Sequence, residues 1–328
     1  MNATNTTSLD EWFIEYANVE LQDLWITVSV SILQLLILGA LIRIEMTSKI
    51  GRKAIFSTLN VLLFVMIISN LLIMVFSQLY SVCYDPVWIV IYISLSYLFS
   101  GVLESVILIY SWIRGFPVIQ LLFPKCQVYM NGFLVLFVIL EIVQFLFLLL
   151  QQIAMYTPLL NDQLDMLTYI STVIPVAVNV VVILFDAFVA GFYVRYLRSV
   201  RGNDLDVEKL EILAYYGIAS CIFLEIWLSG IVIYNYFVIS PTLNVLKLSV
   251  SLRFYDLGPL AFMFIQLAMK WALRNEEVRR DSRKRIRIES AKMASSGQPV
   301  MTLNLEASRP SKEKRRSSGF KQSGSIKE

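Results

Sequence analysis

Residues 243–271, LNVLKLSVSLRFYDLGPLAFMFIQLAMKW, form an apolar stretch long enough to cross a bilayer, yet Arg253 and Asp256 lie inside it. A charge near the bilayer centre costs about 3 kcal/mol on insertion scales, so it normally faces the interior of a helix bundle and has a partner there. Arg253 and Asp256 are three positions apart and share one helix face. Glu225 lies in the middle of the preceding apolar segment. The stretch therefore predicts a helix bundle with a polar interior, in which Arg253 pairs with Asp256 or Glu225.

The chain as a whole has the composition of an integral membrane protein. Of its 328 residues, 57% are hydrophobic and only 16% are charged, which is too apolar for a soluble domain. Apolar runs long enough to cross a bilayer recur at about 24–42, 54–82, 86–113, 128–153, 169–197, 210–240 and 244–272. We predict an all-α membrane protein whose residues 24–272 form a bundle of seven transmembrane helices.

Basic residues give the orientation. All 28 Lys and Arg except Lys247 and Arg253 lie where an extracellular N-terminus would place the cytoplasm, whereas residues 1–23 contain no base. We therefore expect a multi-pass plasma-membrane protein with its N-terminus outside, residues 1–23 being an extracellular tail. Asn2 and Asn5 each begin an N-glycosylation sequon in that tail.

The C-terminal region reads as cytoplasmic. Residues 273–288 predict a basic juxtamembrane helix, and the bases within 274–288 are suited to anionic inner-leaflet lipids. Residues 289–328 have the composition of a disordered tail. Ser317 and Ser318 follow two arginines and match a weak motif for basophilic kinases.

Two features predict the place of the third span. Small residues recur along it at Ser96, Ser100, Gly101 and Ser105, a pattern typical of a helix in the centre of a membrane bundle. Pro117 predicts the end of this helix, because proline cannot donate the backbone hydrogen bond and crowds the preceding turn.

Carboxyl groups outnumber bases at mid-membrane depth. Five acids face the single base Arg253 there: Glu104, Glu141, Asp186, Glu225 and Asp256. They cannot all be ionised at low cost, so several carry a proton or a cation balances them. In a receptor the surplus would attract an amine or another cation, or hold sodium; in a transporter it would relay protons. Each acid has a structural alternative, in which it only fills a polar gap between helices.

Taken together, the seven helices, the outside N-terminus, the short loops, Pro175 in span five, the basic segment and the Ser-rich tail resemble a G-protein-coupled receptor. The specific motifs of the rhodopsin-like class are reduced. Of the family's acid-Arg-Tyr switch only the arginine, Arg114, is present. Trp227 lacks the proline that the family keeps beside its toggle tryptophan, and Asp256-Leu-Gly-Pro259 resembles the family's Asn-Pro motif with altered spacing. Cys83 has no cysteine in the second outer loop with which to pair.

The resemblance implies an unknown extracellular ligand and a heterotrimeric G protein as partners. The pocket would lie among the outer halves of spans three, five, six and seven, with Arg253 and Glu225 at its floor. Its possible lining residues are Trp227, Tyr234 and Tyr255. It also implies a latch at the cytoplasmic ends of spans three and six, joining Arg114 to Glu208 or Glu211, although the positive-inside rule alone also explains Arg114.

The absence of histidine from the whole chain removes His-bound zinc sites and Ser-His or Cys-His dyads. We therefore expect no enzyme activity, no cofactor and no metal site, and nothing in the chain points to nucleic acid. The alternative to a receptor is a seven-helix transporter or channel in which the buried carboxyls and Arg253 form an ion or proton pathway.

Overall fold

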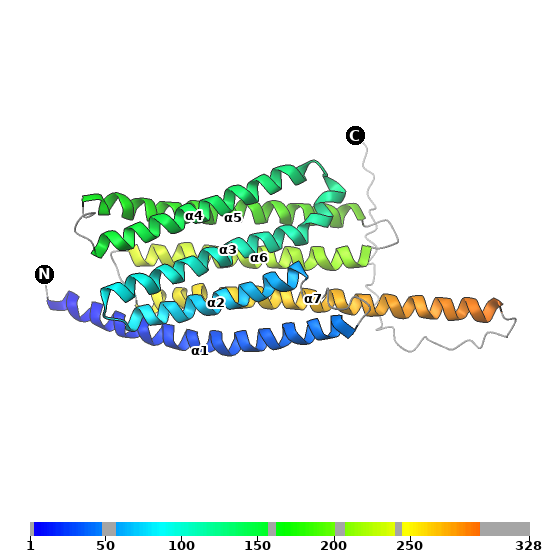
Figure 1. The fold of residues 1–328 in the computed structure, drawn as a ribbon, viewed down its shortest axis with the longest axis horizontal. Helices are drawn as coiled ribbons and strands as arrows, with labels where there is room; N and C mark the ends of the chain where they lie inside the picture. Colours follow the sequence, from blue (N-terminus) through cyan, green and yellow to red (C-terminus); the bar gives the residue numbers. More distant parts are fainter. Residues whose placement is uncertain (1–2, 48–56, 157–161, 201–206, 240–244, 296–328) are drawn as a thin grey trace, which may run out of the picture. The chain divides into compact units, whose positions relative to one another are not determined.

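The computed structural model describes residues 3–47, 57–156, 162–200, 207–239 and 245–295, and these are helical apart from short connections, with no strand among them. The helices are α1 (Ala3–Thr47), α2 (Thr58–Val82), α3 (Pro86–Leu122), α4 (Cys126–Tyr156), α5 (Leu164–Val200), α6 (Val207–Ile239) and α7 (Val245–Ser295) (Figure 1). The prediction of an all-α fold is confirmed for this part of the chain.

Six of these helices, α1 to α6, contain stretches long and apolar enough to cross a membrane. Together they indicate a multi-pass membrane protein. The helix α7 is not among the six. Its apolar stretch is interrupted by Arg253, Asp256, Gln266 and Lys270, which lower its mean hydropathy.

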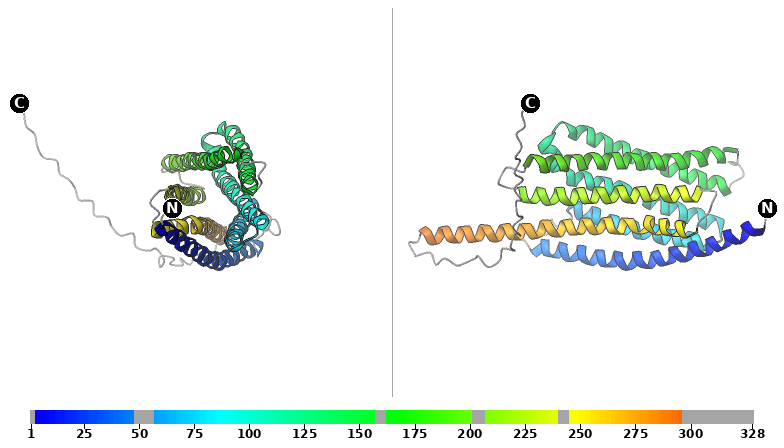
Figure 2. Two further views of the ribbon diagram at one scale, coloured as in Figure 1. Left: turned by 90° about the vertical axis from the view of Figure 1, so that its left-hand side faces the viewer. Right: turned by 180° about the vertical axis from the view of Figure 1, so that it is seen from behind.

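The chain divides into two compact units, Met1–Glu277 and Val278–Glu328. In the first unit each of α1 to α5 packs against the next helix along the chain, and α6 packs against α5 (Figure 2). The helix α3 also packs against α5 and α6, so the small residues of the third span do mark a central helix. Its buried side chains include Leu103, Ile107, Val118 and Ile119, which belong to the apolar core of the bundle.

The predicted start of α3 agrees with the structure, but its predicted end is wrong. The helix begins as expected, because Asp85 caps it: the Asp85 carboxylate accepts a 2.9 Å hydrogen bond from the Val87 amide, and Pro86 occupies the first turn. It does not end at Pro117, which lies inside the helix. Proline removes one backbone hydrogen bond, and the buried side chains of Val118 and Ile119 after it hold the chain on the helical path into the core.

The ends of the chain extend two helices beyond the predicted spans. The helix α1 begins at Ala3 and includes Asn5, so most of the predicted extracellular tail is helical. The predicted basic segment is continuous with α7, which ends at Ser295. Asn2, Ser317 and Ser318, and residues 296–328 of the predicted tail, lie outside the described residues.

Candidate functional site

Arg114 is the centre of a buried polar network in the first unit. Its side chain is only 2% exposed and makes hydrogen bonds to three other helices. The Nε atom donates to Tyr193 Oη on α5 at 3.2 Å. The Nη1 atom donates to Ser220 Oγ on α6 at 2.6 Å and to Gln266 Oε1 on α7 at 2.9 Å. We call these four residues the Arg114 centre; it joins α3, α5, α6 and α7.

Glycine on α6 positions the tyrosine of this centre. A Cβ atom on Gly217 would lie 2.5 Å from Tyr193 Cε2, so the tyrosine ring rests where any side chain would otherwise be. The Arg114 guanidinium carbon lies 5.7 Å from the centroid of the same ring, which adds a cation–π contact to the hydrogen bond. The Ser220 hydroxyl accepts from Arg114 and donates to the Gly217 carbonyl at 2.8 Å, which fixes its orientation.

Asp186 places a carboxyl group beside the centre. It is buried on α5, next to Ser111 of α3 and Cys221 of α6, and close enough to Arg114 for the two charges to interact. Glu225, one turn beyond Cys221, also interacts electrostatically with Asp186. Among the described residues, neither Arg114 Nη2 nor Asp186 Oδ2 has a hydrogen-bond partner. Arg114 and Asp186 thus interact electrostatically in the interior, and no direct ion pair joins them in the described part of the chain.

This geometry argues against the predicted latch from Arg114 to Glu211, and the alternative partner Glu208 stays a prediction. Arg114 lies eight residues before the end of α3, about 12 Å along the helix axis, and not at its C-terminal end. Glu211 is partly buried on α6 near Tyr196, and no ion pair between it and Arg114 is found in the described structure. The side chain of Glu208 is outside the description. Because Pro117 does not end α3, the arginine is carried deep into the bundle, where α5, α6 and α7 surround it.

Arg253 does not have the predicted partner either. Its side chain is exposed and donates from Nη2 to Gln22 Oε1 of α1. No hydrogen bond or ion pair in the described part of the chain joins it to Asp256 or Glu225. On a helix, side chains three apart share a face without being forced into contact, and Arg253 is long enough to reach the solvent-facing side of α1. Asp256 is instead 9% exposed, beneath it.

The predicted pocket residues Trp227 and Tyr255 are in contact. Trp227 Nε1 donates to the Tyr255 backbone carbonyl at 2.9 Å. Pro259, four residues later in α7, has no amide hydrogen for that carbonyl, so the tryptophan replaces the missing helical bond. A Cβ on Gly258 would lie 2.1 Å from Trp227 Cδ1; the indole therefore needs this glycine. The side chain of Tyr234, the third predicted lining residue, is not described.

A second pair of carboxyls lies between α3 and α4. Glu104 and Glu141 are neighbours that interact electrostatically, and Ser100 Oγ donates to Glu104 Oε1 at 3.4 Å. Glu141 is 5% exposed, and a Cβ on Gly101 would lie 3.2 Å from its Oε2, so the glycine leaves room for the carboxyl. Two adjacent carboxyls share a proton readily, because both cannot be ionised at low cost.

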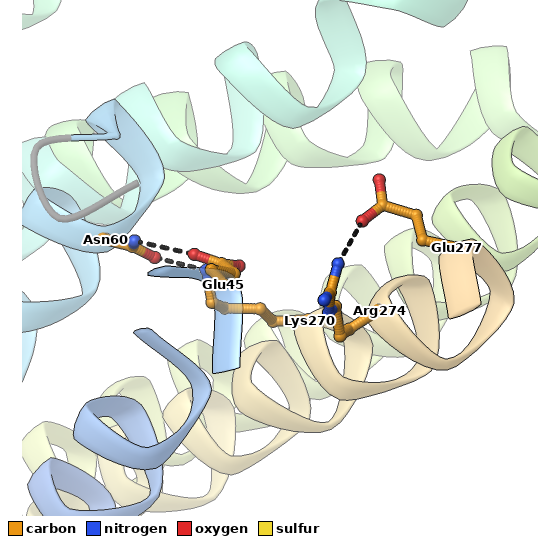
Figure 3. A network of polar contacts seen from close by, with 5 residues as sticks. All are labelled: Glu45, Asn60, Lys270, Arg274 and Glu277. Atoms are coloured by element: carbon orange, nitrogen blue, oxygen red, sulfur yellow. Dashed lines mark hydrogen bonds and ion pairs between the residues drawn. The ribbon is translucent and has the colours of Figure 1, made fainter. Parts of the chain in front are cut away.

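A further polar cluster ties α1, α2 and α7 together (Figure 3). Lys270 Nζ lies 2.6 Å from Glu45 Oε1 and also donates to Asn60 Oδ1, while Asn60 Nδ2 donates to Glu45 Oε2 at 3.3 Å. One turn further along α7, Arg274 forms an ion pair with Glu277 at 3.3 Å. The three helices are held by a closed triangle of charge-assisted bonds.

Three residues of the Arg114 centre, Tyr193, Ser220 and Gln266, did not stand out in the sequence. Tyrosine and serine are common in membrane helices, and their depth relative to Arg114 depends on how far α3 continues after Pro117. Gln266 carried a usable signal, because it is a strongly polar side chain inside an apolar stretch. In the described part of the chain, no group of three or more Asp, Glu or Cys side chains is arranged to hold a metal ion.

No protein family, curated protein or solved structure matches this chain.

Proposed function

We propose that this chain is a seven-transmembrane receptor of the G-protein-coupled type, in the plasma membrane, with its N-terminus outside. The observation that carries the proposal is the Arg114 centre. A buried arginine that joins four helices holds them in one arrangement, and any ligand that favours another arrangement shifts the population between the two. A receptor needs such a two-state element.

The seventh crossing is part of this proposal. Although α7 is less apolar than the other six helices, it is bonded to three of them at successive depths: Trp227 of α6 reaches Tyr255, Gln34 of α1 reaches the Leu260 carbonyl, and Arg114 of α3 reaches Gln266. Its buried side chains include Leu260, Phe262, Met263 and Leu267. A helix that packs so deeply among apolar helices crosses with them, and an odd number of crossings places the two termini on opposite sides.

The distribution of bases supports the orientation, since only Lys247 and Arg253 lie on the N-terminal side of the bundle. The extracellular ligand would enter on that side, above the Trp227–Tyr255 contact, and a heterotrimeric G protein would bind on the other. In the second unit, the described helical residues 278–295 expose Arg279, Lys284 and Arg287 together with Ile286 and Ile288. That combination suits anionic inner-leaflet lipids.

The second candidate function is a proton-coupled transporter, and the Glu104–Glu141 pair favours it. Two neighbouring carboxyls inside membrane helices can take up and release one proton.

The test of the receptor proposal is basal nucleotide exchange on co-expressed G proteins at matched surface expression. Tyr193→Phe and Gln266→Leu each remove one hydrogen bond from Arg114 without exposing it, and a bond of about 1 kcal/mol shifts a two-state population several-fold. We expect each variant to raise ligand-independent exchange by that factor, and exposed Arg198→Ala to leave it unchanged. Exchange no higher than that of empty membranes, with every G protein tested, would reject the receptor. Proton-driven uptake lost in Glu141→Gln would then support the transporter.

A further inference from the structure

A row of buried polar side chains lies between α1 and α7, outside the Arg114 centre. On α1, Asp23, Thr27, Ser31 and Gln34 recur every three or four residues and so share one helix face; all four are fully buried. Two interactions show that this face is turned toward α7. Asp23 interacts electrostatically with Asp256, and Gln34 Nε2 donates to the Leu260 carbonyl at 2.9 Å. The two helices lie side by side in both figures (Figures 1 and 2).

Most polar atoms of this row face the interior without a protein partner. Among the described residues, the buried atoms with no hydrogen-bond partner include both carboxylate oxygens of Asp23, Thr27 Oγ1, Ser31 Oγ, Gln34 Oε1 and Asp256 Oδ2. Buried polar atoms are nearly always satisfied in folded proteins. Asp23 and Gln34 are about 16 Å apart along the helix axis, so one ion cannot contact the whole row. The unpartnered oxygens of Asp23, Thr27 and Asp256, at the N-terminal end of the row, point to a bound group that they coordinate.

The charge of the row selects a cation. A third carboxyl, that of Glu20, is also buried and interacts electrostatically with both Asp23 and Asp256. It accepts a 2.8 Å hydrogen bond from Ser77 Oγ of α2. The nearest base, Arg253, interacts electrostatically with Asp23, but its side chain is exposed and hydrogen-bonded to Gln22, so it does not occupy the buried row. Carboxylate, hydroxyl and amide oxygens are hard ligands for small cations. Divalent ions need a denser carboxylate cage, and the described residues contain no such group of three.

The row is closed at its far end. The same face of α1 continues with Leu38 and Leu41, which are buried against Leu63, Met66 and Ile67 in the apolar core. A cation cannot pass this apolar layer at low cost. The polar row is therefore a blind site that exchanges with the side of the bundle where α1 begins, and not part of a pathway through the protein.

We propose that Asp23 and Thr27 of α1, with Asp256 of α7, bind a small monovalent cation that enters from the N-terminal side of the bundle, and that Ser31 and Gln34 continue the polar row beyond it. The ion ties α1 to α7 by neutralising carboxyls on both helices. The site is independent of the Arg114 centre and of any G protein, so its test stands whether or not the receptor proposal holds.

The experiment measures thermal unfolding of the purified full chain in detergent at constant ionic strength, while N-methyl-D-glucammonium chloride is replaced by sodium, potassium or methylammonium chloride. We expect the melting temperature to rise and saturate with at least one small cation. A larger rise with sodium or potassium assigns the site to a metal ion, and a larger rise with methylammonium assigns it to a primary ammonium.

Two variants test the residues. Asp23→Asn and the nearly isosteric Thr27→Val should each weaken the apparent affinity by about tenfold or more, because each removes a ligand to a charged group. Ser29→Ala, exposed on the other side of α1, and Asp165→Asn, exposed on α5, are the matched controls and should keep the wild-type response. A wild-type melting temperature that is the same in every salt would overturn the proposal. So would a cation response that survives unchanged in both Asp23→Asn and Thr27→Val.

Discussion

At the scale of the residue, Arg114 shows how a membrane bundle stabilises a buried charge. Its partners Tyr193, Ser220 and Gln266 are neutral, so the guanidinium is solvated by dipoles from three helices, while Asp186 interacts with it electrostatically. Removing the arginine would leave that carboxyl as an uncompensated charge in the interior, and such a loss is larger than the worth of the interaction itself.

Arg114→Ala should therefore lower the free energy of unfolding by about 3 kcal/mol, and adding Asp186→Asn should recover part of that loss, because the neutral amide no longer needs a counter-charge. The measurement is a double-mutant cycle on thermal unfolding in detergent. Exposed Arg198→Ala is the control and should change little. Effects of the two substitutions that add within about 0.5 kcal/mol would show that Arg114 and Asp186 do not interact energetically.

Gly258 gives a second prediction at this scale. A Cβ there would lie 2.1 Å from Trp227 Cδ1, so Gly258→Ala must push α6 and α7 apart and break the Trp227–Tyr255 bond. We expect a loss of about 2 kcal/mol or more from overpacking and the lost bond.

Gly132→Ala is the matched control, because a Cβ at this helical glycine meets nothing within 4 Å. It should be neutral, or stabilising by up to about 1 kcal/mol through helix propensity. Thermal unfolding of both variants in one detergent decides the question; equal melting temperatures would mean that Trp227 moves freely away from Gly258.

At the scale of the element, apolar runs predicted the helices well, since their length is set by the bilayer. What they could not predict is how far a helix continues past a signal that normally ends it. Pro117 was expected to end α3, and this one error placed Arg114 at the membrane surface and suggested Glu208 or Glu211 as its partner. The polar row of α1 was missed for a related reason: Asp23 was assigned to the tail, although Asp23, Thr27, Ser31 and Gln34 follow one helical period.

The triangle of Glu45, Asn60 and Lys270 ties three elements, α1, α2 and α7 (Figure 3). The side chains of Lys270 and Glu45 are 13% and 20% exposed, so solvent screens the pair only in part. Lys270→Met should cost about 1–2 kcal/mol of stability. The exchanged pair, Glu45→Lys with Lys270→Glu, should recover more than half of what either charge reversal alone loses. Thermal unfolding measures both, and an exchanged pair no better than the worse single reversal would contradict the ion pair.

At the scale of the whole molecule, the sequence predicted the membrane class from composition alone, whereas no local pattern revealed which helices meet at Arg114. That convergence depends on packing between segments far apart in the chain, such as Arg114 with Gln266, and a single sequence does not encode depth residue by residue. The same limit applies to the number of crossings. The polar residues of α7 bond to other helices, but they also lower the mean hydropathy by which a membrane crossing is recognised.

The last prediction concerns topology, and it follows from the bases. If α7 crosses the membrane with the other six helices, an epitope added before Asn2 should be labelled on intact cells, and one added after Ser318 only after permeabilisation. Glycosidase should also shift the electrophoretic band unless Asn2 and Asn5 are both changed to Gln, because only a translocated N-terminus meets the glycosylation machinery. The full chain carries both epitopes, so each epitope serves as the reference for the other and no truncated chain is needed as a control. Labelling of both epitopes on intact cells would show that the number of crossings is even. In that case α7 would lie outside the bilayer, and the receptor proposal would fail.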